Sequence, residues 1–258
     1  MTVSRMRLDR LLVEKGMAAT RQRAQALIMA GQVLINHQPV DKAGHMASED
    51  ADIVIKGEDM PFVSRGGLKL DHALMAFEIS PQNMVCLDVG ASTGGFTDCL
   101  LQQGAARVYA VDVGYGQLAW RLRQDSRVIA IERMNIRHMP QSMLPEPVDL
   151  VTVDASFISL KIVIPAVIKF MKPNAQIVAL IKPQFEVGKG CVGKGGVVRE
   201  PQQHDRVIAE LRQFFTDAGW RSLSVVPSPV LGPKGNREFL IHISDNDISG
   251  DSLWLKKQ

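Results

Sequence analysis

The pattern of apolar and polar residues divides the chain into two regions with different periods. In the first, leucines recur at helical spacing in "RLDRLLVEKG", and Thr20 is placed to cap a second helix that Gly31 ends. Short runs of alternating residues follow in "QVLINHQPV" and "ADIVIKG", which are typical of strands. Residues 1–57 are therefore expected to form a small α+β domain.

The second region alternates short apolar runs with helical patterns. The runs "MVCLDVG", "RVYAVDVG", "RVIAIERM", "DLVTVDASF" and "AQIVALIKP" are rich in β-branched residues, as strands buried on both faces are. Helical segments lie between them, so the pattern predicts right-handed βαβ units and a mostly parallel sheet. "RSLSVVPSPV" and "REFLIHIS" predict a closing antiparallel hairpin. The fold expected for residues 65–245 is a doubly wound, Rossmann-like α/β domain.

Two further segments lie outside these patterns. Residues 58–64, "EDMPFVS", are acidic and contain Pro61, which predicts a linker between the domains. Residues 246–258 are expected to form a C-terminal tail.

Composition narrows the classes of protein that this chain can be. Its 258 residues are 46% hydrophobic, which is ample for a core, and the formal net charge is only +3. Three cysteines without a CxxC pair are typical of a reducing compartment, and no metal site is expected. The N-terminal residues do not resemble a signal peptide, and no apolar run is long enough to span a bilayer. We expect a soluble, cytoplasmic protein.

Basic residues gather in the first domain. Clustered cations on a small module favour contact with nucleic-acid phosphates over a merely solvated basic face. The candidates are Arg5, Arg7, Arg10, Arg21 and Arg23.

The loop after the first strand of the second domain predicts a ligand site. Ligands of such sheets bind at the carboxyl ends of the strands, and "DVGASTGGFTD" combines glycines there with a helix N-terminus. Its G-x-x-x-G-G spacing is not that of a dinucleotide site, and Asp112, which ends the next strand, is placed to accept ribose hydroxyls. A carboxylate at Asp88 favours the sulfonium of S-adenosylmethionine (AdoMet) over a pyrophosphate; the alternative is an ordinary strand-to-helix turn. The candidate residues in this region are Asp88, Gly90, Ala91, Ser92, Thr93, Gly94, Gly95, Phe96 and Asp112.

A second glycine-rich stretch, "GKGCVGKGG", almost matches a phosphate-binding P-loop. Gly195 stands where a Ser or Thr should hold magnesium, so an NTPase is rejected. Lys189 and Lys194 are expected to belong to a mobile basic loop that covers the cleft or contacts RNA, with a plain linker as the alternative.

Four ionisable residues are expected to converge at one edge of the sheet. Lys69 begins a helix, Asp154 and Lys182 end strands in "VTVDASF" and "IVALIKPQFE", and Glu238 opens the last strand. A structural network of ion pairs is the alternative to a catalytic role.

At these residues the chain resembles the TlyA (hemolysin A) family of ribosomal RNA 2′-O-methyltransferases, an S4-like domain joined to an FtsJ-like methyltransferase. The resemblance covers nearly the whole chain and is carried by "VSRGGLKL", "DVGASTGGFTD", "VDASFISL", "LIKPQFE" and "GNREFL". It places the Lys-Asp-Lys-Glu tetrad of FtsJ-like enzymes on Lys69, Asp154, Lys182 and Glu238.

The resemblance implies AdoMet-dependent methylation of a ribose, with a cytidine of ribosomal RNA as the target and ribosomal subunits as partners. It also implies that Asn135 lies near the adenine, that Asp154 faces the sulfonium, and that Arg65 joins the RNA-binding residues. Because a 2′-hydroxyl is a poor nucleophile, the enzyme must orient it and help its proton leave. Lys182 is the candidate for this step, either as a neutral base or as an ammonium that stabilises developing negative charge. Lys69 would orient the ribose, and Asp154 and Glu238 would fix the two amines.

Two other functions compete with this one. The name hemolysin raises a membrane-active cytolysin, which no apolar span or strongly amphipathic cationic segment supports. An RNA-binding protein without catalysis is the third possibility, and the complete tetrad argues against it.

Overall fold

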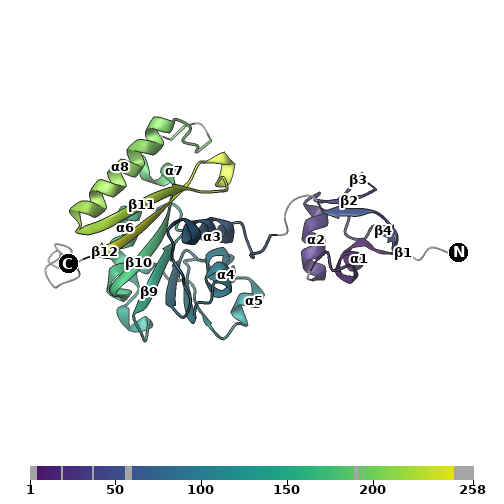
Figure 1. The fold of residues 1–258 in the computed structure, drawn as a ribbon, viewed down its shortest axis with the longest axis horizontal. Helices are drawn as coiled ribbons and strands as arrows, with labels where there is room; N and C mark the ends of the chain where they lie inside the picture. The colour runs from purple at the N-terminus through teal and green to yellow at the C-terminus, as the bar shows by residue number, and fades with distance from the viewer. Residues whose placement is uncertain are drawn as a thin grey trace. The chain divides into compact units, whose positions relative to one another are not determined.

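The computed structural model describes residues 5–18, 20–36, 38–55, 60–188, 192–193 and 195–246. It divides the chain into two compact units, residues 1–60 and 61–258 (Figure 1).

The first unit packs two short helices on short strands. Helices α1 (Leu8–Glu14) and α2 (Arg21–Met29) carry the apolar faces that the spacing predicted, and Leu8, Leu12 and Ile28 are fully buried between them. Thr20 caps α2, because its Oγ1 accepts from the backbone N–H of Arg23 at 3.2 Å. The strands are β1 (Arg5–Arg7), β2 (Val33–Ile35), β3 (Gln38–Val40), β4 (Met46–Ser48) and β5 (Ile53–Ile55), with β1 paired to β4 and β2 lying between β3 and β5.

The second unit is built on a seven-stranded sheet of order β11-β12-β10-β9-β6-β7-β8. Strands β6 to β10 run parallel, and β12 is antiparallel to both β10 and β11. The prediction of a doubly wound sheet with a closing hairpin is confirmed. The strands are β6 (Val85–Val89), β7 (Arg107–Val111), β8 (Val128–Ile131), β9 (Val148–Val153), β10 (Met171–Ile181), β11 (Trp220–Pro227) and β12 (Phe239–Asn246).

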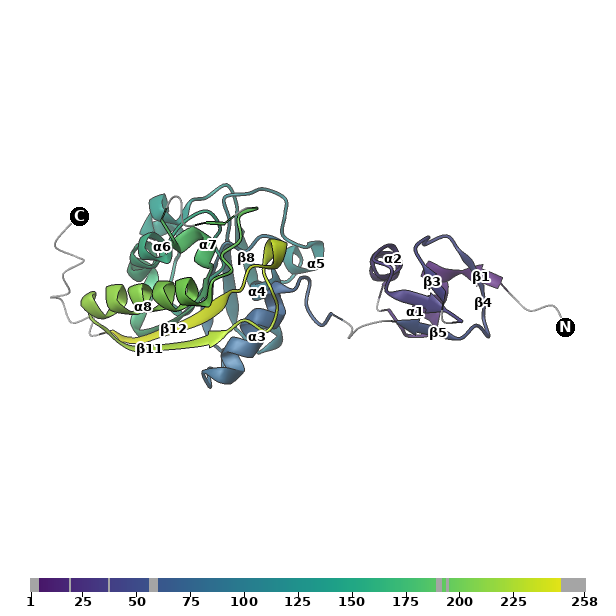
Figure 2. The ribbon, with the colours of Figure 1, turned by 90° about the horizontal axis from the view of Figure 1, so that it is seen from above.

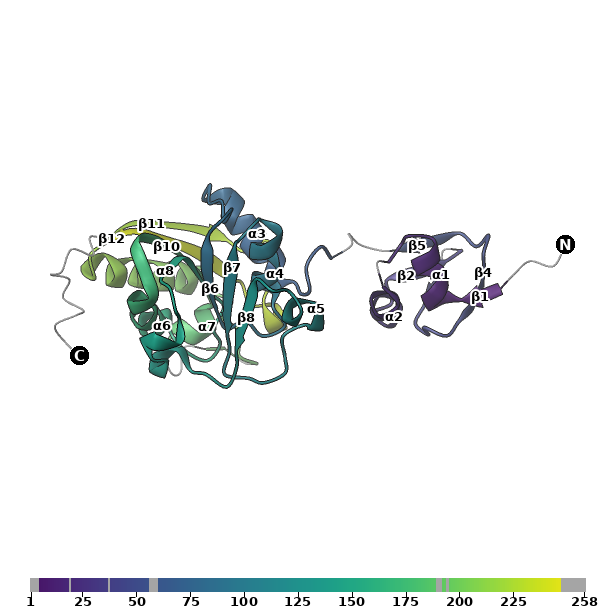
Figure 3. The same cartoon turned by 90° about the horizontal axis from the view of Figure 1, so that it is seen from below.

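Helices cover both faces of this sheet (Figures 2 and 3). Helices α3 (Gly66–Ala76), α4 (Gly95–Gln102) and α5 (Trp120–Arg123) contribute to one apolar core, and α6 (Leu160–Val167) and α8 (Pro201–Asp217) contribute to the other. Alternate residues of each strand enter opposite cores, so that in β6 Cys86 faces α4 while Leu87 and Val89 face α6. The short helices α7 (Pro183–Glu186), η1 (Ile136–His138), η2 (Gln141–Met143), η3 (Ile168–Phe170) and η4 (Pro233–Gly235) complete the unit.

The predicted linker differs from the structure at its C-terminal end. Residues 61–64 belong to the second unit: Phe62 is buried, and the backbone N–H of Val63 donates to Asp98 at 2.7 Å. Residues 56–59 and 247–258, which include the predicted end of the first domain and nearly all of the predicted tail, lie outside the described residues.

Candidate active site

Strands β6 and β9 end side by side, and the site is built where they end. The backbone N–H of Asp154, the first residue after β9, donates to the carbonyl of Val89 at 2.9 Å. Gly90 follows Val89 with a φ of +86°, and a β-carbon there would lie 2.8 Å from the carbonyl oxygen of Asp154. Only glycine fits at position 90, since a side chain there would push the ends of β6 and β9 apart.

A cavity of about 840 Å³ opens beside Gly90 and Asp154, where the two strands end. Carboxylate, amide and hydroxyl groups line it together with apolar and aromatic side chains, as in sites for small organic ligands. Its lining includes Gly90, Ser92, Asp112, Gln117, Met134, Asn135, Asp154, Ser156, Phe157 and Phe185.

Asp112 is held at the end of β7 by the glycine-rich loop. One carboxylate oxygen accepts from the backbone N–H of Ser92 at 2.8 Å, and the other accepts from that of Gly114 at 2.6 Å. Each oxygen keeps a second lone pair, so a carboxylate fixed in this way can still accept hydroxyl groups of a ligand. Asn135 is exposed on the same cavity, and its Oδ1 accepts from the backbone N–H of Arg137 at 3.1 Å.

Two predicted loop residues pack closely against other parts of the protein. A β-carbon on Gly94, whose φ is +94°, would overlap Leu122 and lie 2.7 Å from Leu118; Gly94 therefore permits close packing beneath the loop. Gly95 lies equally close to the start of α3, because its β-carbon would approach the backbone N of Gly67 to 2.9 Å. Gly95 lines a cavity beside the loop, whereas Gly94 lines neither cavity of this site.

Asp88 is the predicted residue whose position differs most from the expectation. Its side chain is fully buried on the α4 side of the sheet and lines neither cavity. The hydroxyls of Thr97 and Thr152 donate to it at 2.7 and 3.1 Å. Burial raises the pKa of Asp88 to about 7. Asp88 thus ties β6, β9 and α4 together below the loop, and strand alternation explains why its side chain points away from the ligand side.

A second cavity, of about 390 Å³, also borders Gly90 and Asp154. It shares Gly90, Ser92 and Asp154 with the larger cavity. The remaining lining residues are Ser64, Arg65, Gly66, Lys69, Ala91, Thr93, Gly95, Phe96 and Gly232.

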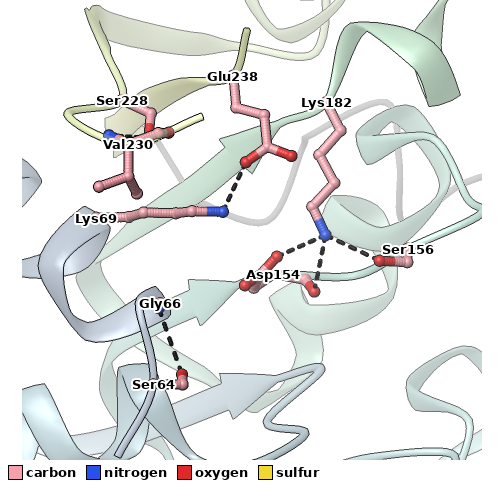
Figure 4. Close-up of polar contacts among 9 residues, drawn as sticks. All are labelled: Ser64, Gly66, Lys69, Asp154, Ser156, Lys182, Ser228, Val230 and Glu238. Atoms are coloured by element: carbon pink, nitrogen blue, oxygen red, sulfur yellow. Dashed lines mark hydrogen bonds and ion pairs between the residues drawn. The ribbon is translucent and has the colours of Figure 1, made fainter. Parts of the chain in front are cut away.

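The four predicted tetrad residues meet as two ion pairs (Figure 4). Lys69 Nζ lies 2.6 Å from Glu238 Oε2, and Lys182 Nζ lies 2.6 Å from Asp154 Oδ1. Lys69, Lys182 and Glu238 are buried, while Asp154 is half-buried at the shared cavity wall. Because the two lysine amines are buried, each is held in place by the carboxylate with which it pairs.

Lys182 has acceptors beyond the carboxylate of Asp154. Its Nζ also donates to Ser156 Oγ at 2.9 Å and lies 3.4 Å from the carbonyl oxygen of Asp154. Ser156 is exposed on the larger cavity, and Figure 4 shows its hydroxyl beside the amine. Lys182 directly follows β10 and is the N-cap residue of α7, so the buried strand leads straight into a charged residue.

The other carboxylate oxygen of Glu238 is confined by a glycine. Oε1 is buried and has no hydrogen-bond partner among the described residues. A β-carbon on Gly232 would overlap this oxygen and lie 3.0 Å from Oε2. Glu238 therefore occupies space that any other residue at position 232 would take.

Two functional candidates were not predicted from the sequence. Ser156 and Gly232 are small residues in loops, and only the fold brings them to the tetrad. Phe157, which lines the larger cavity, is 89% exposed with a φ of +64°, and its ring lies 4.9 Å from that of Phe185 at the cavity wall. A non-glycine residue with positive φ at a cavity is a signal that structure supplies and sequence does not.

The predicted RNA-binding residues lie in different places. Arg5, Arg10 and Arg23 lie on the first unit; Arg5 and Arg10 are exposed. Arg7 and Arg21 both pair with the buried carboxylate of Asp9. Arg65 is exposed on the smaller cavity, and Lys189 and Lys194 lie outside the described residues.

The residues that the structure describes offer neither a membrane-spanning helix nor a cluster of metal-binding side chains. No helix there is long and apolar enough to cross a membrane. No group of three or more His, Cys, Asp or Glu side chains in the same part of the chain is placed to hold a metal ion.

Known families match both units. The model of the FtsJ-like methyltransferase family matches residues 62–244, and that of the S4 domain matches residues 6–53. A solved structure of an N-methyltransferase, NodS of Bradyrhizobium japonicum, covers 71% of this chain and 98% of its own with a TM-score of 0.51 at 15% identity, which shows the fold alone.

Closer relatives cover nearly the whole chain. The 16S/23S rRNA (cytidine-2′-O)-methyltransferase TlyA of Mycobacterium tuberculosis is 48% identical over 98% of this chain and 91% of its own. Hemolysin A of Brachyspira hyodysenteriae is 40% identical over 92% of this chain and 99% of its own. A solved structure from Streptococcus thermophilus, also named as a hemolysin, has a TM-score of 0.74 at 41% identity and covers 95% of this chain and 90% of its own. With the two cavities, the tetrad and the S4 unit, these matches place the chain in the FtsJ-like methyltransferase family, among its TlyA-type members.

Proposed function

We propose that the protein transfers the methyl group of AdoMet to a ribose 2′-hydroxyl of ribosomal RNA. The observation that carries the proposal is the position of the Lys182 amine. It lies 2.6 Å from Asp154, and Asp154 forms part of the wall that the two cavities share. A group that must meet both a methyl donor and an acceptor belongs at such a place.

The larger cavity fits the methyl donor. Asp112 offers two oriented oxygens for ribose hydroxyls, and Asn135 and Met134 line the region beyond it, where an adenine would lie. Gly90 and Asp154 would flank the sulfonium end. When bound, AdoMet supplies an electrophilic methyl group, and no metal ion is required for that chemistry.

The tetrad would prepare the acceptor. Lys69, fixed by Glu238, reaches the smaller cavity and would donate a hydrogen bond that orients the ribose. Lys182 would remove the 2′-proton or stabilise the alkoxide that forms as the proton leaves. Asp154 holds that amine while the reacting oxygen approaches.

The substrate follows from the relatives and from the S4 unit. Relatives of this chain bear names that specify cytidine 2′-O-methylation of 16S and 23S rRNA. We infer a cytidine of ribosomal RNA as the target, ribosomal subunits as partners, and the cytoplasm as the place of action. Removing residues 1–57 should abolish methylation of subunits while AdoMet affinity stays within about twofold, because the cofactor residues all lie in the second unit.

Two substitutions at Lys182 test the chemistry. Lys182→Ala should eliminate turnover while AdoMet and RNA affinity persist, because the amine acts mainly in the transition state. Lys182→Arg keeps the charge but cannot be deprotonated, so it should fail almost as badly if Lys182 is the base. The measurement is transfer of tritium from labelled AdoMet to separated ribosomal subunits, followed by mapping of the 2′-O-methyl mark. Normal methylation by Lys182→Ala would refute the catalytic assignment, and substantial activity of Lys182→Arg would leave Lys182 an electrostatic stabiliser.

A further inference from the structure

A fully buried carboxylate lies beneath the basic surface of the first unit. Asp9 is the second residue of α1 and has no exposed surface. Arg7, at the end of β1, donates to it through Nε and Nη2, both at 3.1 Å. Arg21, the first residue of α2, donates through Nε at 2.9 Å, and Gln25, one turn later, donates at 2.8 Å. Four donors from two elements, β1 and α2, therefore meet on one side chain of α1.

Both guanidinium groups keep an outward side. The side chains of Arg7 and Arg21 are 45% and 53% exposed, although the carboxylate that holds them is fully buried. Arg21 uses only Nε for Asp9, which leaves its two terminal nitrogens for other acceptors. The three charges sum to +1, so the cluster still attracts an anion.

We propose that Asp9 is a positioning residue that holds Arg7 and Arg21 side by side as a site for RNA phosphate groups. The proposal rests on the proposed function, because it takes ribosomal RNA as the ligand. Arginine presents a planar fork that matches a phosphate, and binding is weakened when a long side chain must first be ordered. A buried anchor removes that ordering cost in advance for both residues.

A purely stabilising role for Asp9 accounts less well for this arrangement. A buried ion pair often contributes no more to stability than apolar residues of the same volume would. Exposed arginines would serve general attraction to RNA without any anchor, as Arg5 and Arg10 can. The convergence of two half-exposed guanidiniums on one hidden carboxylate is explained by the geometry that it imposes on them.

Asp9→Asn distinguishes a positioning role from simple electrostatic attraction, because the two predict opposite changes in RNA affinity. The substitution adds one positive charge to the unit, so simple attraction predicts RNA binding about two- to threefold tighter. Loss of the anchor predicts binding at least about fivefold weaker and a smaller slope of log affinity against log salt. Asp41→Asn is the matched control, because Asp41 is exposed on the same unit and its substitution adds the same charge.

The experiment measures binding of the full-length protein to purified ribosomal subunits and to their extracted RNA at several salt concentrations. Asp9→Asn should bind more weakly than Asp41→Asn, and it should have no further effect in an Arg7→Ala, Arg21→Ala background. Equal or tighter binding by Asp9→Asn, or an undiminished effect in that background, would overturn the proposal. If Asp9→Asn does not fold by circular dichroism, Arg7→Lys with Arg21→Lys keeps the charge and removes the forks, and unchanged affinity there would equally overturn it. If the unsubstituted protein does not bind ribosomal subunits or their RNA, the proposed function itself is overturned.

Discussion

Gly232→Ala should disable the tetrad although no tetrad residue is replaced. The added β-carbon would overlap Oε1 and Cδ of Glu238 and lie 3.0 Å from Oε2. Atoms of this kind pack at about 3.5 Å, so the carboxylate must retreat by about 1 Å. The φ of Gly232 lies outside the left-handed region, and backbone strain therefore plays no part.

The retreat breaks the 2.6 Å contact between Glu238 and Lys69. Misplacing a catalytic group by about 1 Å costs on the order of 100-fold in rate, and we expect a loss of that size in kcat. Overpacking of a buried site should lower the free energy of unfolding by about 1–3 kcal/mol. The affinity for AdoMet should change little, since the larger cavity is not lined by Gly232.

Single-turnover methyl transfer to ribosomal subunits, calorimetric titration of AdoMet and thermal melting measure the three quantities. Gly188→Ala is the matched control, because a β-carbon at Gly188 meets no atom within 4 Å. If Gly232→Ala methylates at the unsubstituted rate, Glu238 is not needed at its observed position, and the role assigned to the Lys69 pair is wrong.

Three further substitutions test other parts of the site. Asp112→Ala should weaken AdoMet binding by about 1–3 kcal/mol in calorimetry, and unchanged affinity would mean that the cofactor site is misplaced. Ser156→Ala removes an acceptor 2.9 Å from Lys182, so it should lower kcat more than AdoMet affinity; an unchanged kcat would leave Ser156 a passive neighbour. Because the pKa of Asp88 is raised to about 7 in the folded state, its contribution to stability is greatest below about pH 4 and is lost as pH rises toward 7. Asp88→Asn should flatten that decline in the melting temperature, and a decline as steep as before would show that Asp88 does not cause it.

The sequence predicted the scaffold well because strand and helix periods are local. The alternation of apolar runs gave the parallel strands, and strand ends located Asp112, Asp154 and Lys182 at one edge of the sheet. The direction of a side chain at a strand end is harder to predict. Asp88 was expected near the ligand, but strand alternation directs its side chain into the core beside α4. Contacts such as that of Gly232 with Glu238 depend on how a distant loop packs, which no local pattern encodes.

The shared wall of the two cavities has a thermodynamic consequence. Gly90, Ser92 and Asp154 border both spaces, so a ligand in one changes the surroundings of a ligand in the other. Any such coupling is reciprocal: if RNA tightens the binding of the methyl donor by some factor, the donor tightens the binding of RNA by the same factor. Methyl transfer exchanges both ligands for products at once, and the same reciprocity then holds for the products: each changes the affinity of the other by one common factor.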